Sequence, residues 1–267
     1  MKRNIGFIGC GKMASAIISG ISKSEKYLVR GSEVTPAVAQ EAANRLGIEV
    51  FADNKRLALI SDVIIIATKP NQVELVLRDI LPRIEGTDKL IVSIAAGVTT
   101  EKIENTLDDA RVVRVMPNTP ALVKLGMFGV CCGSYATLED EEFVVEMLNT
   151  IGKCITVEER QMDLVTAISG SGPAFFYQVI EDMARAGERL GLEYDKALTL
   201  AAQTALGSAK MVFERGNVPV QTLIDNVATK GGCTFVGISE MKALNSAQMF
   251  YNVIGKTARK ANELGRG

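Results

Sequence analysis

Residues 4–14 read Asn-Ile-Gly-Phe-Ile-Gly-Cys-Gly-Lys-Met-Ala, and this stretch decides the fold. Its apolar start, residues 5–8, is too short for a helix and suits a buried strand. Gly9, Gly11 and Ala14 follow in the pattern Gly-x-Gly-x-x-Ala, with apolar residues at helical spacing behind them. A strand, a glycine turn and a helix in that order place helix N-terminal N–H groups where a pyrophosphate sits. The stretch therefore predicts a dinucleotide-binding turn.

The residues that would meet the adenosine ribose bear on the choice between NAD and NADP. Glu33 lies nineteen residues after Ala14, near the spacing of about 20 residues at which an acidic group holds the ribose hydroxyls. A carboxylate there favours NAD because it repels a 2′-phosphate. Arg30 and Ser32 offer the alternative, a phosphate pocket, if the strand before them ends earlier. These residues are compatible with either NADH or NADPH as the cofactor.

Composition narrows the class of protein. The chain has 267 residues, of which 47% are hydrophobic, and a net charge of −1. The hydrophobic content is high enough for a buried core. The near-zero net charge gives no reason to expect a polyanionic partner such as nucleic acid. Its apolar runs are too short to span a bilayer, and its N-terminus lacks the shape of a signal peptide. We expect a cytoplasmic protein that binds neither nucleic acid nor membrane.

Cysteine and histidine usage limits the chemistry. The five cysteines are an odd number without Cys-x-x-Cys spacing, which indicates free thiols. Histidine is absent, which removes the commonest metal ligand and the Ser-His and Cys-His nucleophile pairs. We expect no metal site. Any proton chemistry must use Lys, Tyr, a carboxylate, a thiol, water or the substrate itself.

Short apolar strands alternate with helices up to about residue 157, after which long helical segments follow. This order predicts an α/β fold, an N-terminal Rossmann-type doubly wound parallel sheet with a C-terminal all-α domain. The small-residue helix faces of the second domain predict that it is a dimerisation domain. We place the domains at 1–160 and 161–267. The strands are expected at 26–33, 49–51, 62–68, 90–94, 112–116, 127–132 and 154–157 besides the first. The long helices are expected at 173–190, 194–215 and 248–264.

Ligands of open parallel sheets bind outside the carboxyl ends of the strands, so the loops at those ends are candidate binding loops. Residues 68–71, 95–97 and 117–120 supply small residues and prolines at those points. Two further glycine-rich stretches, 169–174 and 229–234, precede helices in the second domain. Both are predicted to be helix-starting turns whose N–H groups and hydroxyls suit a carboxylate.

In these and further segments the chain resembles the pyrroline-5-carboxylate reductase family over nearly its whole length. The similarity is carried by 6–14, 69–72 (Lys-Pro-Asn-Gln), 93–97 (Ser-Ile-Ala-Ala-Gly), 114–120 (Arg-Val-Met-Pro-Asn-Thr-Pro), 169–174 (Ser-Gly-Ser-Gly-Pro-Ala) and 225–234. The first is common to many Rossmann enzymes, whereas 114–120, 169–174 and their joint order are much more specific.

The resemblance implies a reductase that makes L-proline from 1-pyrroline-5-carboxylate with NADPH or NADH, in proline biosynthesis. It also implies a homodimer, with dimers often building larger rings. The substrate would meet Ser171, Gly231, Gly232, Cys233 and Thr234, with Thr234 near the ring nitrogen as the catalytic residue. Together with the residues chosen above, the cofactor would meet Gly9, Gly11, Lys12, Met13, Ser32, Glu33, Asn54, Lys69, Pro70, Ala95, Ala96 and Asn118.

The substrate loop departs from the family pattern, which usually reads Ser-Pro-Gly-Gly, then Thr or Ala, then Thr. Here Thr229, Lys230 and Cys233 stand at three of those positions. Two alternatives follow, a paralogue with a variant substrate and a non-catalytic dinucleotide-binding regulator. A β-hydroxyacid dehydrogenase shares the two-domain plan but needs a lysine shortly after its second glycine motif, where this chain has residues 175–177, Phe-Phe-Tyr.

Overall fold

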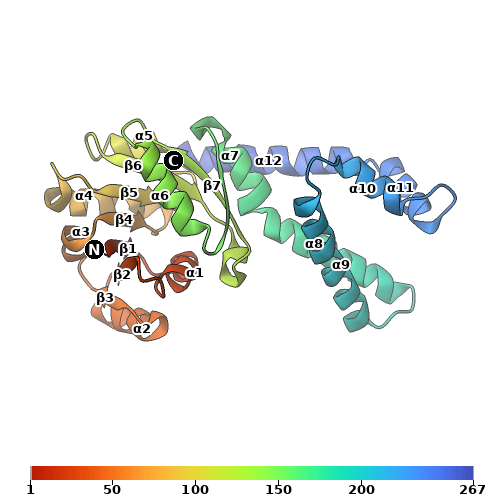
Figure 1. The fold of residues 1–267 in the computed structure, drawn as a ribbon, viewed down its shortest axis with the longest axis horizontal. Coiled ribbons are helices and arrows are strands. Elements are labelled where there is room, and N and C mark those ends of the chain that lie inside the picture. The colour runs from red at the N-terminus through yellow and green to blue at the C-terminus, as the bar shows by residue number, and fades with distance from the viewer. Residues whose placement is uncertain (1, 267) are drawn as a thin grey trace. The chain divides into compact units, whose positions relative to one another are not determined.

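The computed structural model describes residues 2–266, which form two compact units (Figure 1). Unit 1 comprises Met1–Ser171 together with Lys256–Gly267, and unit 2 is Gly172–Gly255. The chain thus leaves unit 1 at Ser171, past the composition change that we used for a boundary at residue 160. Its last segment returns to unit 1, although the sequence suggested a single helical domain from residue 161 onward.

Unit 1 is built on one eight-stranded sheet with the order β3-β2-β1-β4-β5-β6-β7-β8. The strands are β1 (Arg3–Ile8), β2 (Tyr27–Ser32), β3 (Glu49–Phe51), β4 (Val63–Ile66), β5 (Leu90–Ser93), β6 (Arg111–Met116), β7 (Gly126–Cys132) and β8 (Gly152–Thr156). All neighbours are parallel except β6 and β7, which are antiparallel. The predicted doubly wound sheet is confirmed, with this one junction of the opposite sense.

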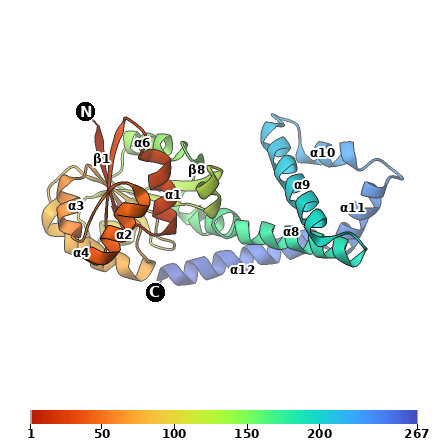
Figure 2. The same cartoon turned by 90° about the horizontal axis from the view of Figure 1, so that it is seen from below.

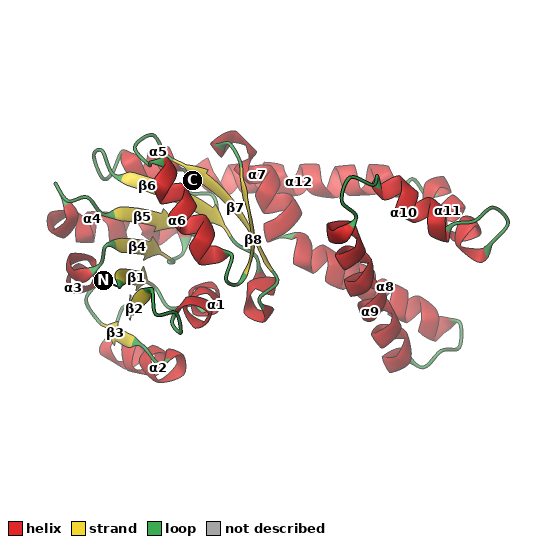
Figure 3. Ribbon diagram, viewed as in Figure 1, coloured by secondary structure: helices red, strands yellow, loops and turns green. Residues whose placement is uncertain are grey.

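Helices cover both faces of the sheet, as the ribbon coloured by secondary structure shows (Figure 3). The helices of unit 1 before residue 160 are α1 (Lys12–Ile21), α2 (Pro36–Leu46), α3 (Asn54–Ile60), α4 (Val73–Ile84), α5 (Thr100–Glu104) and α6 (Leu138–Leu148). Short 3₁₀ helices are η1 (Pro70–Gln72), η2 (Thr119–Val123) and η3 (Glu159–Gln161). One buried cluster joins the sheet to α1, α2 and α6, and a second joins it to α3, α4 and α5.

The central strand β4 shows why the sheet is buried on both faces. Its four residues are Val-Ile-Ile-Ile, and all four are buried. Because side chains alternate along a strand, Val63 and Ile65 join the cluster with α1, while Ile64 and Ile66 join the cluster with α4. A continuous β-branched run therefore specifies a strand covered on both sides, as in other parallel sheets.

The glycine-rich stretch 169–174 does not form the predicted open turn. The chain passes from α7 (Met162–Val165) through a π-helical turn, η4 (Thr166–Gly170), into α8 (Gly172–Arg189). The Ser171 N–H donates to the Thr166 carbonyl at 2.8 Å, five residues back. The Ser171 N–H is therefore not free, and the expectation of an open turn with free N–H groups is wrong here. The long helix predicted to follow this stretch is confirmed as α8, which begins at Gly172. Glycine and proline at a helix entry resemble a turn in sequence, but the helix runs almost without a break.

Unit 2 contains most of α8, then α9 (Tyr194–Glu214), α10 (Val220–Val227), α11 (Cys233–Ala243) and the first part of α12 (Ser246–Arg266). Helix α9 follows the end of α8 at an angle to it and contacts it there (Figure 2), with the Tyr194 hydroxyl donating to Glu181 at 2.6 Å. Many large apolar side chains on these helices stay exposed, including Phe176, Phe213 and Tyr251. Unit 2 thus presents apolar surface that a single chain does not cover.

No helix among residues 2–266 is both long and apolar enough to cross a membrane.

The buried β4 strand gives a direct test of this core. Ile65 is fully buried, so Ile65→Ala leaves a cavity and is expected to lower the free energy of unfolding by about 2–5 kcal/mol. The matched change Leu75→Ala, at an exposed position of α4, is expected to alter it by less than about 0.5 kcal/mol. Urea denaturation at one protein concentration measures both. Equal losses for the two variants would contradict the assigned core.

Candidate functional site

The glycine turn between β1 and α1 has the geometry of a phosphate-binding loop. Gly9 adopts φ +91°, and a Cβ there would lie 3.0 Å from the Ala67 carbonyl oxygen. Gly11 caps α1 with no side chain satisfying the first N–H groups, and nothing lies within 4 Å of the place of its Cβ. The N-terminus of α1 is therefore open to an anionic group, which a pyrophosphate fits.

Strand register brings the predicted cofactor residues of unit 1 to one edge. Ile8, the last residue of β1, pairs with Ser32 and Ile66, which end β2 and β4. Ser93 ends β5 opposite Ile66, and Phe51 ends β3 opposite Ser32. The loops that follow these strands carry the predicted cofactor residues Gly9, Gly11, Lys12, Met13, Glu33, Asn54, Lys69, Pro70, Ala95 and Ala96.

Ser32 and Asn54 support this edge from within. The Ser32 side chain is fully buried, and its hydroxyl donates to the Asn54 Oδ1 at 2.8 Å. Ser32 also accepts the Gly9 N–H through its carbonyl at 3.0 Å. Ser32 therefore anchors the glycine turn to the end of β2, and its hydroxyl is already engaged.

Glu33 points to the glycine turn, whereas Arg30 does not. The Cys10 N–H donates to the Glu33 Oε1 at 2.7 Å. Arg30 pairs with Gly6 in the β1–β2 register and forms a 3.0 Å ion pair with Glu49. The alternative phosphate pocket of Arg30 and Ser32 is therefore not formed, because β2 continues to Ser32 and Arg30 lies within it.

Thr68 belongs to the same edge, although it was predicted only as part of the loop 68–71 and without a role of its own. It follows β4 directly, and its methyl group lies 3.4 Å from the place of a Cβ on Gly9. Its Oγ1 is buried without a hydrogen-bond partner among the described residues. An unsatisfied buried hydroxyl is costly, so a group bound over the glycine turn is a natural partner. Its position directly after a buried strand is the only sequence signal for it.

Cys10, inside the turn, is a packing residue. Burial, and secondarily the charge of Glu33, raise the pKa of its thiol to about 12. A neutral, buried thiol is a poor nucleophile. A Cβ on Gly31 would lie 2.5 Å from the Cys10 sulfur, which shows how closely β2 approaches the turn.

Asn118 is held at both ends of its amide. Its Oδ1 accepts the Met127 N–H at 2.9 Å, and its Nδ2 donates to the Ser169 carbonyl at 3.2 Å. The side chain thus joins the end of β6, the start of β7 and the π-helical turn. This role in positioning the chain is additional to the contact with a cofactor predicted for it.

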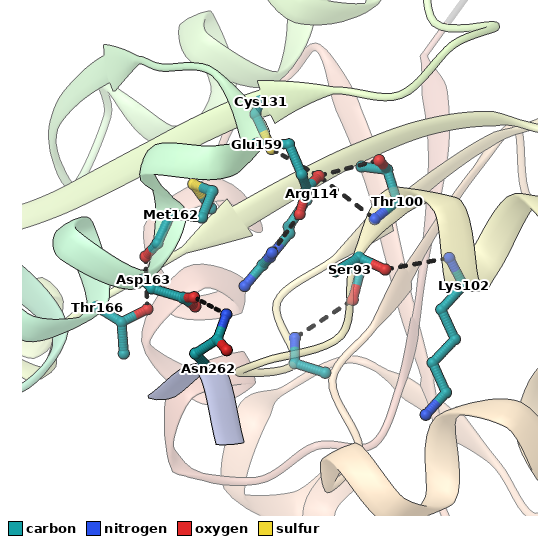
Figure 4. A network of polar contacts seen from close by, with 12 residues as sticks. Ser93, Thr100, Lys102, Arg114, Cys131, Glu159, Met162, Asp163, Thr166 and Asn262 are labelled. Carbon is teal, nitrogen blue, oxygen red and sulfur yellow. Dashed lines mark hydrogen bonds and ion pairs between the residues drawn. The ribbon is translucent and has the colours of Figure 1, made fainter. Parts of the chain in front are cut away.

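A polar network lies behind the loop that follows β5 (Figure 4). Arg114 of β6 is almost fully buried and forms an ion pair with Glu159. The same carboxylate accepts the Thr100 hydroxyl at 2.9 Å and the Cys131 thiol at 3.3 Å. One carboxylate thus ties β6, β7 and the start of α5 together. One guanidinium nitrogen of Arg114 stays unpaired within the part of the chain described.

The end of α12 packs on the same region of unit 1. Asn262 donates to Asp163 at 2.8 Å. A Cβ on Gly97 would lie 3.1 Å from the Gly265 Cα, so the backbones of the β5 loop and of α12 are in close contact. The predicted cofactor residues Ala95 and Ala96 therefore belong to a loop that the C-terminal part of α12 contacts. No local sequence pattern predicts this contact.

The second glycine-rich stretch behaves as predicted within unit 2. Gly231 has φ +81°, and Gly232 caps α11 with no side-chain hydrogen bond to its first N–H groups. Cys233 is exposed, Thr234 is half-buried, and the Thr234 hydroxyl has no partner among residues 2–266. The loop combines open N–H groups with a free hydroxyl, which suits a carboxylate. Ser171, the other predicted substrate residue, is the last residue of unit 1 before α8 begins.

Comparison with known proteins adds to this geometry. A family profile described as pyrroline-5-carboxylate reductase dimerisation matches residues 159–264, and one described as NADP oxidoreductase, coenzyme F420-dependent, matches residues 4–97. The pyrroline-5-carboxylate reductase of Methanosarcina acetivorans is 39% identical, with 99% of this chain and 98% of that protein covered. This chain belongs to the pyrroline-5-carboxylate reductase family.

Solved structures of family members agree with this. The pyrroline-5-carboxylate reductase of Coxiella burnetii has a TM-score of 0.92 at 31% identity, with 99% of both chains covered. The Plasmodium falciparum pyrroline carboxylate reductase, crystallised with NADP bound, has a TM-score of 0.86 at 31% identity, with 98% of both chains covered. The family resemblance read from the sequence is thereby confirmed, and membership sets the β-hydroxyacid dehydrogenase alternative aside.

The two bonds of Asn118 predict a structural effect that does not depend on a cofactor. Asn118→Ala leaves the partly buried Met127 N–H without its acceptor, so we expect the free energy of unfolding to fall by about 1–3 kcal/mol. Asn71→Ala, at an exposed position of η1, serves as the control and is expected to change it little. Denaturation of the cofactor-free protein measures both. An unchanged stability for Asn118→Ala would refute the positioning role.

Proposed function

We propose that this protein reduces the C=N bond of 1-pyrroline-5-carboxylate to give L-proline, with a hydride from NADH or NADPH. The observation that carries the proposal is the 39% identity to a pyrroline-5-carboxylate reductase across 99% of the chain. The open N-termini of α1 and α11 supply what this reaction needs, a seat for a dinucleotide and a seat for a carboxylate.

The cofactor would lie along the carboxyl edge of the sheet. Gly9, Gly11, Lys12 and Met13 would hold its pyrophosphate, with Ser32, Glu33 and Asn54 toward the adenosine. The loops with Lys69, Pro70, Ala95, Ala96 and Asn118 would line its nicotinamide half. The bound nicotinamide supplies a hydride, and the protein supplies orientation.

The substrate would be held by the loop before α11. The N–H groups of Gly231 and Cys233 suit its carboxylate, and Ser171 offers a further hydroxyl. Gly232 lies between them and shapes the loop, because its own N–H donates to the Thr229 carbonyl at 2.9 Å. Protonation of the ring nitrogen makes C5 electrophilic, and addition of the hydride to C5 converts the C=N bond into CH–NH. One hydride and one proton are consumed, with Thr234 beside the nitrogen to orient the proton or donate it.

Self-association and a cytoplasmic location complete the proposal. The match to a dimerisation profile over residues 159–264 and the exposed apolar side chains of unit 2 support a homodimer. A dimer that builds larger rings would be consistent with the same surfaces.

A direct assay tests the reaction. The full chain is mixed with 1-pyrroline-5-carboxylate and either NADH or NADPH, and cofactor oxidation and proline formation are followed together. Proline formed in equal amount to oxidised cofactor supports the proposal. Cofactor binding without any oxidation would instead favour a non-catalytic regulator, the alternative raised by Thr229, Lys230 and Cys233.

Thr234 gives a sharper test of the site. Loss of a hydrogen bond to a charged or developing-charge group costs about 1.5–3 kcal/mol, so Thr234→Ala is expected to lower kcat/KM by roughly 10- to 150-fold. Thr234→Ser retains the hydroxyl and is expected to stay within about threefold of wild type. Steady-state kinetics measure both, and wild-type values for Thr234→Ala would refute the catalytic assignment.

A further inference from the structure

We propose that Glu33 makes NADH the preferred hydride donor of this protein, by holding the adenosine ribose hydroxyls and repelling the 2′-phosphate of NADPH. The inference rests on the proposed function for the reaction, but it concerns binding at unit 1 and is tested there. A preference between the two dinucleotides goes beyond the family assignment.

The backbone places Glu33 at the point where β2 meets the glycine turn. The Glu33 N–H donates to the Phe51 carbonyl at 2.9 Å, which fixes the residue to the end of β3. Ser32, just before it, accepts the Gly9 N–H at 3.0 Å. Glu33 therefore comes directly after Ser32, the last residue of β2. In a Rossmann fold this is the position that meets the adenosine ribose.

The side chain is already oriented before any cofactor binds. Its Oε1 accepts the Cys10 N–H at 2.7 Å, and Cys10 lies between the two glycines of the turn. The other carboxylate oxygen has no hydrogen-bond partner among residues 2–266. It is thus available to a ribose hydroxyl, and no rotamer search has to precede binding.

The cations around this carboxylate are committed elsewhere. Arg30 is paired with Glu49 at 3.0 Å, and Arg45 donates to the Cys10 carbonyl at 2.8 Å and to the Ser15 hydroxyl. A 2′-phosphate at the end of β2 would therefore meet the negative charge of Glu33. Neither Arg30 nor Arg45 would offset that charge without giving up the bonds described above.

Two further cations lie in the neighbouring elements. Arg56 of α3 lies over the Phe51 ring, 4.4 Å from its centroid. Lys12 stands at the first position of α1, next to the place of the pyrophosphate rather than at the end of β2. Neither supplies a cluster of donors for a phosphate beside Glu33, so repulsion governs the discrimination.

The test measures the dissociation constants of NADH and NADPH with the full chain, by calorimetry and without substrate. We expect NADH to bind at least about tenfold more tightly, because an uncompensated carboxylate faces a doubly charged phosphate. Glu33→Gln keeps an acceptor for the Cys10 N–H but removes the charge. This variant is expected to lower the dissociation constant of NADPH about tenfold, so that the constants of NADH and NADPH differ by no more than about threefold.

Glu25→Gln is the matched control. Glu25 is exposed and precedes β2, whereas Glu33 follows it, so the same charge is removed at the opposite end of one strand. We expect both dissociation constants to stay at wild-type values. A change in preference as large as that of Glu33→Gln would show an effect of net charge alone and would overturn the assignment.

A ligand-side comparison removes any dependence on the folding of a variant. Wild-type protein is titrated with ADP-ribose and with 2′-phospho-ADP-ribose, which differ only in the group that Glu33 should repel. Tighter binding of ADP-ribose supports the proposal. Equal or tighter binding of the phosphorylated ligand overturns it.

Kinetics with 1-pyrroline-5-carboxylate separate this inference from the proposed function. A higher kcat/KM with NADH than with NADPH supports both. Tighter NADH binding without any proline formation supports the role of Glu33 and refutes the reaction. Proline formation with NADPH at equal or greater kcat/KM, together with equal dissociation constants, supports the reaction and overturns the role of Glu33.

Discussion

The close passage of the glycine turn between two neighbouring strands is the constraint on which unit 1 depends. At Gly9 the backbone has φ +91° and comes so near to the Ala67 carbonyl that a Cβ would lie 3.0 Å from its oxygen. The turn is held from the other side by the Ser32 carbonyl. A side chain at Gly9 would separate β1 from β4 and strain the backbone as well. The tight turn leads directly into α1 and so positions the open N-terminus of that helix at the edge of the sheet.

The polar groups around that turn divide into those that build it and those that are left for a ligand. The hydroxyl of Ser32 and the carbonyl of Cys10 are engaged by protein partners. Within the described part of the chain, the Thr68 hydroxyl, one oxygen of Glu33 and the first N–H groups of α1 have no such partner. Unsatisfied polar groups gathered at one sheet edge are expected where a bound molecule completes the hydrogen bonding.

Sequence reasoning succeeded where a local rule determines local structure. Thr35 caps α2 and Pro36 begins it, as expected of these residue types at a helix start, and the β-branched run of β4 is buried on both faces. It failed where the deciding partner is remote. The antiparallel pairing of β7 and the return of α12 to Gly97 depend on residues far away in the chain, which no spacing pattern encodes. The π-helical turn at 166–170 was missed because glycine and proline have the same signature in a turn and at a helix entry.

The site residues show the same division. Glu33 could be found from its distance to the glycine motif, because the length of α1 and β2 sets that spacing. The choice between Glu33 and the pair Arg30 and Ser32 needed the end of β2, and strand ends are poorly determined by sequence. Thr68 and the positioning role of Asn118 needed hydrogen-bond partners, which only the folded chain supplies.

The loop before α11 depends on more than its own residues. Every residue of α10 and α11 is at least partly exposed in the single chain, and Phe235, Val236 and Met241 of α11 are all exposed. Isolated helices of 8 and 11 residues are marginal in water, so packing must stabilise them. In the proposed homodimer the partner chain would supply that packing. The seat for the substrate carboxylate at Gly231 and Gly232 would then become rigid only on assembly, which gives the dimer a part in catalysis beyond stability.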